Sequence, residues 1–188
     1  MAIDKIQSES INLADNFAFT GTVTGAGGIT EVDTFRTNAN QTISASTTTV
    51  IAGNWERDDL IFEKVGTGMS ESSGIFTFPS TGKYLILFQT YVYGFGTSGS
   101  ESAQYVQTRL DGTSDNSSYS TISIADTPGD ANTGVRYTSN STHAFFDVTN
   151  TSTHKVRFRV YIDGKSGNCY GHSSTNNTFA TFIRLGDT

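Results

Sequence analysis

The sequence predicts an all-β protein, a sandwich or jelly roll of about eight to ten strands. Glycine, serine, threonine and asparagine are abundant, and the chain of 188 residues has 13 phenylalanines and 8 tyrosines. Residues of these types favour turns and strands. Alternating apolar and polar residues recur between turn signals, and no segment shows a helical period. Composition and periodicity therefore indicate strands joined by long polar loops.

The first part of the chain, residues 1–28, is expected to form an extended N-terminal arm. Its apolar residues are too thinly spaced to build a core, and the stretch Gly25-Ala26-Gly27-Gly28 is a flexible joint. The arm either stays a loosely ordered terminus or becomes ordered on a partner by adding to a sheet edge or groove. In the second case it is an attachment arm, and its contacts would be Ile3, Ile6, Phe17, Phe19 and Val23.

The folded domain is predicted to span residues 29–188. Short strands are expected in its first part, at residues 32–37, 41–45 and 48–52. A loop at residues 54–59 carries the only tryptophan, Trp55. This side chain either fills a gap in the packing or serves as an anchor for a sugar or a protein partner.

A hairpin over residues 74–94 is the most informative stretch of the chain. Pro79 and Gly82 favour a tight turn between its two strands. The second strand is apolar on both faces: Tyr84, Ile86, Phe88, Thr90 and Val92 on one, and Leu85, Leu87, Gln89, Tyr91 and Tyr93 on the other. A strand with one solvated face should alternate apolar and polar residues. Since no helix is predicted that could cover the second face, we expect another copy of the chain to cover it.

Further strands follow the hairpin at residues 104–110, 121–125, 135–138, 143–148, 155–162 and 178–185. Turns are expected at Asp111-Gly112 and at Asp163-Gly164. The last strand is again apolar on both faces, with Phe179 and Ile183 on one and Ala180 and Phe182 on the other. A basic row, Lys155, Arg157 and Arg159, is either a solvated outer face or a docking site for an acidic partner.

Charge and length exclude several classes of protein. A net charge of -6 argues against a nucleic-acid partner and against a polybasic membrane-surface protein. No apolar run approaches the roughly 20 residues of a membrane span, so no membrane partner is expected. The N-terminal residues lack the apolar region of a signal peptide. Because Cys169 is the only cysteine, no intrachain disulfide is possible.

The sequence offers no catalytic motif, and we expect a protein that is not an enzyme and needs no cofactor or metal. His143, His154 and His172 stand far apart, and Cys169 with His172 makes half a zinc site at best. Four aspartates, in predicted loops, are interpreted as solvated turn residues, with a loop calcium site as the alternative: Asp111, Asp115, Asp126 and Asp130.

The hairpin resembles a motif of the complement 1q and tumour necrosis factor superfamily. Its Gly74-x-Phe76-Thr77-x-Pro79-x-x-Gly82-x-Tyr84 spacing is similar to that family's, and residues 178–183 resemble the family's C-terminal strand, with Thr181 in place of a glycine. The resemblance covers about residues 30–188. It implies a ten-stranded jelly roll that forms a homotrimer, whose inner sheet packs aromatic residues about the three-fold axis. The residues expected to divide between core and trimer interface are Tyr84, Leu85, Leu87, Tyr91, Tyr93, Phe179 and Phe182.

The N-terminal stretches 1–7 and 17–25 resemble leaders of structural proteins from marine tailed bacteriophages. This resemblance implies a virion protein, assembled in the host cytoplasm. We expect a homotrimeric capsid decoration protein, held by its N-terminal arm on the major capsid protein or on a fibre or tail component. The alternative is the receptor-binding tip of a tail fibre, which would bind a host-surface glycan through polar loops at residues 94–103, 111–120 and 164–177.

Overall fold

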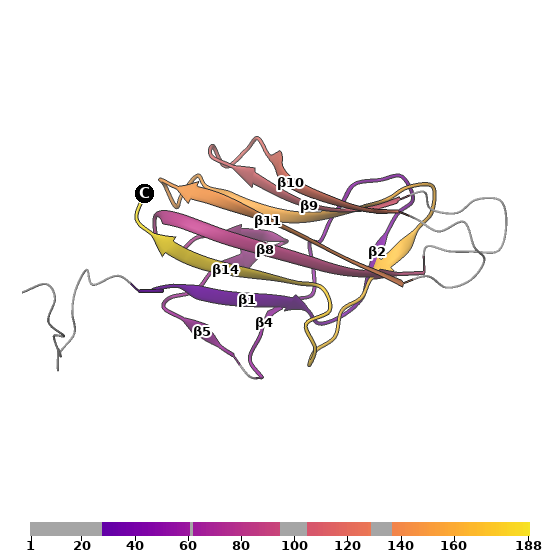
Figure 1. Ribbon diagram of the computed structural model, residues 1–188, viewed down its shortest axis with the longest axis horizontal. Coiled ribbons are helices and arrows are strands. Elements are labelled where there is room, and N and C mark those ends of the chain that lie inside the picture. The colour runs from indigo at the N-terminus through magenta and orange to yellow at the C-terminus, as the bar shows by residue number, and fades with distance from the viewer. Residues whose placement is uncertain (1–27, 61, 95–104, 129–136) are drawn as a thin grey trace, which may run out of the picture.

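The computed structural model describes residues 28–60, 62–94, 105–128 and 137–188. The predicted arm lies outside the described residues apart from Gly28, as do most of the loop at 94–103 and part of the strand expected at 135–138. The described residues form strands and no helix (Figure 1). The strands are β1 (Val32–Thr37), β2 (Gln41–Ile43), β3 (Thr49–Val50), β4 (Trp55–Arg57), β5 (Lys64–Val65), β6 (Ser70–Ser72), β7 (Ile75–Thr77), β8 (Gly82–Tyr93), β9 (Tyr105–Thr113), β10 (Ser120–Pro128), β11 (Tyr137–Val148), β12 (Lys155–Ile162), β13 (Gly167–Cys169) and β14 (Phe179–Gly186).

Two antiparallel sheets make a β-sandwich, which confirms the predicted all-β class. The eight-stranded sheet has the order β2-β13-β8-β14-β1-β4, with β11 paired to β8 and β5 paired to β1. The six-stranded sheet has the order β10-β9-β12-β7-β6, with β3 paired to β12. The hairpin predicted over residues 74–94 is therefore wrong, because β7 lies in this sheet and β8 in the other. In Figure 1, β11, β8, β14 and β1 run side by side along the length of the molecule.

Aromatic rings fill the core between the sheets. The ring of Phe76 lies 5.2–5.3 Å, centroid to centroid, from the rings of Phe35, Trp55, Phe158 and Phe182. Trp55 packs against this core and donates its indole N–H to the carbonyl of Ile51 at 2.8 Å, so its packing role is confirmed. Contacts between rings in this range add to the free energy of burial. Among the described residues, the buried phenylalanines are Phe35, Phe76, Phe78, Phe88, Phe158 and Phe182.

The turn predicted at Asp111-Gly112 is wrong, because β9 runs on to Thr113. Asp111 is fully buried and accepts hydrogen bonds from Arg157 and Arg159 on β12, which hold this stretch in the sheet. The turn instead lies around Asp115, whose carboxylate accepts the backbone N–H groups of the two serines that follow at 117 and 118. Long-range ion pairs thus override a local turn signal.

The sequence also predicts two strands, at 135–138 and 143–148, where the structure has one continuous strand from Tyr137 to Val148. The polar residues in between, 139–142, pair with residues 88–91 of β8. Asn140, for example, lies opposite Thr90 and donates its side-chain amide to the carbonyl of Ala125. Pairing with a long apolar partner strand therefore keeps a polar stretch in the sheet.

The buried Arg36 on β1 forms ion pairs at the edge of the eight-stranded sheet. The guanidinium of Arg36 donates to Glu56 Oε1 at 2.8 Å, to Asp58 Oδ1 at 2.7 Å and to Asp59 Oδ1 at 2.9 Å. Asn176, in the loop before β14, donates to the second oxygen of Asp58 at 2.9 Å. This network ties β1 to β4 and to the loop that leads into the last strand.

The pH dependence of stability should report on this network. Burial acts to raise the pKa of Asp58, but hydrogen bonds from Asn176 and Arg36 outweigh it and hold the pKa below the usual 3.8. A carboxylate whose pKa is lower in the folded state stabilises the fold above its unfolded pKa, and this contribution is lost as the pH falls through the folded value. Urea unfolding of Asp58→Asn should therefore show a smaller loss of stability below pH 3.8 than the wild type. Equal losses in the two proteins would contradict this role of Asp58.

Candidate assembly surface

The register of β8 separates its two apolar faces. Its even-numbered side chains, from Tyr84 to Val92, are buried in the core. Its odd-numbered side chains, from Lys83 to Tyr93, point away from the core and are partly or largely exposed. The surface of the eight-stranded sheet that carries these odd-numbered side chains is called the outer face below.

Of the seven residues expected to divide between core and trimer interface, two belong to the core. Tyr84 and Phe182 are each 1% exposed, since both occupy inward positions of their strands. The hydroxyl of Tyr84 donates to the carbonyl of Ser80 at 3.1 Å, and the ring of Phe182 packs on Phe76. Neither side chain can reach a second copy of the chain, so Tyr84 and Phe182 belong to the core and not to the trimer interface.

The other five predicted interface residues lie on the outer face: Leu85, Leu87, Tyr91 and Tyr93 on β8 and Phe179 on β14. The predicted arm contacts, Ile3, Ile6, Phe17, Phe19 and Val23, lie outside the described residues.

Apolar side chains cover one half of the outer face. Leu87 on β8 is 38% exposed, Phe145 on β11 is 70% exposed and Leu185 on β14 is 51% exposed. Leu85 lies directly opposite Phe145 on one side and Ile183 on the other. This set, called the apolar half below, comprises Leu85, Leu87, Phe145, Phe179, Ile183 and Leu185.

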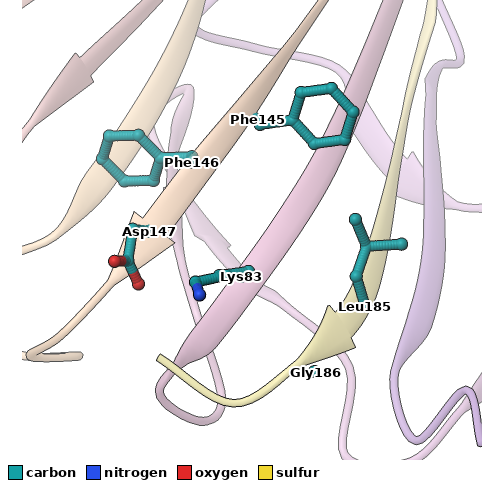
Figure 2. Close-up of a pocket in the computed structure, with 6 residues that line it drawn as sticks. All are labelled: Lys83, Phe145, Phe146, Asp147, Leu185 and Gly186. Carbon is teal, nitrogen blue, oxygen red and sulfur yellow. The ribbon is translucent and has the colours of Figure 1, made fainter.

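Two hollows mark the apolar half. One, of about 380 Å³, is lined by Lys83, Phe145 and Leu185, among others. Figure 2 shows Phe145 on β11 and Leu185 on β14, the strands that flank β8, and Lys83 of β8 close to Asp147. The other, of about 350 Å³, is lined by Leu87, His143 and Phe179, among others. Exposed apolar residues around shallow hollows are typical of a surface that a macromolecule covers.

Aromatic rings cover the other half. Tyr137 stacks on Tyr91 and on Tyr93, with ring centroids 5.8 Å apart in both cases. Tyr170 meets the same two rings edge to face at 5.8 and 5.7 Å, and His172 stacks on Tyr170 at 6.4 Å. These five residues are called the tyrosine cluster below. Tyrosine supplies a large contact area at a small cost in side-chain entropy, which suits an interface.

Charge is scarce on the part of the outer face that β8 and β11 form. Of the outward positions of β8 and β11, all of them described, only Lys83 and Asp147 carry a formal charge. These two face each other at one end of the strand pair. Depletion of charge at the centre of an apolar, tyrosine-rich surface is the composition of a protein–protein interface.

The possible metal ligands of the described residues do not cluster. Among these residues, no group of three or more histidine, cysteine, aspartate and glutamate side chains lies close enough to hold a metal ion. Cys169 is buried, which raises its pKa to about 12, whereas His172 is exposed and stacks on Tyr170. Within the same described residues, no helix is long and apolar enough to span a membrane.

The predicted interface lacked six members of the surface: Tyr137, Phe145, Tyr170, His172, Ile183 and Leu185. For Phe145 the signal was present, because the alternation of Ala144, Phe146 and Val148 toward the core leaves Phe145 pointing outward. Tyr170 follows a short strand inside a predicted loop, so no periodicity pointed to it.

Comparison with solved structures defines the class of fold as a tumour necrosis factor-like jelly roll. The crystal structure of murine APRIL at pH 8.0 is similar with a TM-score of 0.56 and 14% sequence identity, over 82% of this chain and 98% of that one. The structure of Eiger TNF from S. frugiperda is similar with a TM-score of 0.56 and 14% identity, over 84% of this chain and 93% of that one. No protein-family model matches the sequence. No curated protein matches it either. At this identity the likeness shows the fold alone.

Proposed function

We propose that the protein is a structural assembly module without catalytic activity, and that it forms a homotrimer through the outer face. The observation that carries the proposal is the apolar half, which no part of the described chain covers. An antiparallel sheet of a sandwich normally presents a polar face to water. Three copies about a three-fold axis would bury this surface in identical interfaces.

Burial of large apolar side chains would stabilise the trimer. Each fully buried leucine or phenylalanine contributes about 1.5–3 kcal/mol, and Leu87, Phe145 and Leu185 are all available on every copy. The stacked rings of the tyrosine cluster extend the same surface. The likeness to tumour necrosis factor-like structures supports the proposal, since the resembled superfamily assembles as homotrimers through its inner sheet.

We further propose that the protein is a virion protein that is assembled in the host cytoplasm. It would decorate a bacteriophage capsid and be held there by residues 1–28. The support for this proposal is the resemblance of the N-terminal stretches to leaders of phage structural proteins. Cryo-electron microscopy of the particle tests it. Density for the trimer on the capsid surface is expected, whereas density at appendage tips would favour the receptor- or glycan-binding alternative.

Removal of the arm should separate attachment from assembly. A protein that lacks residues 1–28 should keep its trimeric mass in light scattering, because the outer face is built entirely by later residues. It should no longer sediment with purified particles, because the apolar contacts of the arm are gone. A truncated protein that still sediments with particles would refute the attachment role.

A further inference from the structure

The six-stranded sheet carries an unusual pair of arginines on the surface that faces away from the core. Arg109 on β9 and Arg159 on β12 lie directly opposite each other in the antiparallel register. Like charges in directly opposed positions destabilise a sheet. The pair therefore costs stability in the isolated chain, and a compensating role should be sought in binding.

The carboxylates nearby do not neutralise this surface. Buried Asp111 accepts from Arg157 Nε at 3.1 Å and from Arg159 Nη2 at 2.7 Å, so one negative charge serves two guanidinium groups. In the described part of the chain, no carboxylate lies within ion-pair distance of Arg109, whose guanidinium donates to the neutral side chain of Gln107. The three arginines and Asp111 are called the arginine face below.

Two further carboxylates and one lysine lie near the arginines, so four cations stand against three carboxylates in this part of the described chain. Asp126 lies opposite Gln107 on β10, and Asp163 accepts the hydroxyl of Tyr161 at 2.9 Å. Lys155 adds a further positive charge at the start of β12 and donates to the carbonyl of Thr151. Tyr161 also supports Arg109, whose guanidinium carbon lies 5.6 Å from the centroid of its ring. This contact holds the guanidinium over an aromatic surface.

Exposed apolar side chains flank the arginine face on both sides. Ile124 on β10 lies opposite Arg109, and Ile75 on β7 lies opposite Arg157; both isoleucines are exposed. Arginine next to exposed aliphatic residues is typical of protein–protein interfaces rather than of sites for free anions. The guanidinium fork also matches the planar carboxylate in a bidentate manner.

We propose that the arginine face docks an acidic segment of a partner protein. Carboxylates of the segment bind between Arg109 and Arg159, and its apolar side chains cover Ile75 and Ile124. Recognition of the acidic segment depends on the local positive charge of the arginine face, because the chain as a whole has a net charge of -6. The surface belongs to the sheet opposite the outer face, so the proposal stands apart from the homotrimer and both surfaces can be occupied together.

The test is a binding titration of the full-length protein with a fluorescent peptide rich in glutamate and phenylalanine. The wild type should bind it, and Arg109→Gln should weaken binding by roughly tenfold or more, the effect of losing a charge-assisted bidentate contact. Arg109→Lys should bind with intermediate affinity, because it keeps the charge and loses the fork. Lys64→Gln, which removes a positive charge on the eight-stranded sheet, is the control and should bind like the wild type.

A thermal melt distinguishes binding from a structural role. Arg109→Gln relieves the like-charge pair, so its melting temperature should equal or exceed that of the wild type. Light scattering should show the same oligomer for all variants, which separates this test from that of the homotrimer. The proposal is overturned by a wild type that does not bind the peptide, by equal binding of Arg109→Gln, or by a clear loss of thermal stability in that variant. Tighter binding to a sulfated polysaccharide than to the peptide would also overturn it.

Discussion

Replacement of Leu87 with aspartate is expected to convert the trimer into a monomer that remains folded. Leu87 is 38% exposed in the single chain, so the carboxylate of the variant is solvated and the sandwich keeps its core. In the trimer the same carboxylate would be buried without a partner, at a cost of several kcal/mol per copy. Light scattering should give three times 20.2 kDa for the wild type and a single 20.2 kDa chain for Leu87→Asp.

A control variant shows whether the position or merely the introduced aspartate disrupts the trimer. Ile124 on β10 is also exposed but belongs to the six-stranded sheet, so Ile124→Asp should leave the trimer intact. Circular dichroism should show the strand content of the wild type in both variants. A trimeric Leu87→Asp protein would remove the apolar half from the interface.

Replacement of Phe76 with alanine is expected to have the largest effect on the stability of the single chain. Phe76 is fully buried at the centre of the core and contacts four other aromatic rings. Truncation of a buried phenylalanine costs about 3–5 kcal/mol, from lost burial and from the cavity left behind. This loss is a large fraction of the roughly 5–15 kcal/mol that stabilises a typical domain.

The measurement is urea unfolding in the Leu87→Asp background, where assembly adds nothing to the stability. Phe145→Ala in the same background is the control, because that ring is 70% exposed in the single chain. Phe76→Ala should lower the free energy of unfolding severalfold more than Phe145→Ala. Equal effects of the two substitutions would contradict the assignment of Phe76 to the core and Phe145 to the outer face.

The fold class could be predicted from the sequence because alternation is a local property. The inward set Val156, Phe158, Val160 and Ile162 of β12 is buried as the pattern predicts. The long strand β8 was predicted with both of its apolar faces, and the exposed Leu87 on β8 and Leu185 on β14 lie on the sheet surface that the described chain leaves uncovered.

The candidate assembly surface was less predictable, because it depends on strand register and on contacts between residues that are distant in the sequence. Alternation alone does not say which face of β8 meets the other sheet, so it could not separate the core residues Tyr84 and Phe182 from the interface candidates. The buried Asp111 was taken for a turn residue, because its two arginine partners come from β12, far along the chain. The tyrosine cluster likewise joins β8, β11 and a residue next to β13.

The burial of the outer face between copies is the central claim, and thiol labelling of Phe145→Cys tests it most directly. The native Cys169 is buried and its pKa is raised to about 12, so it should not react. The introduced thiol should be protected in the full-length trimer and should react rapidly once Leu87→Asp is added. Equally rapid labelling in both backgrounds would contradict the claim.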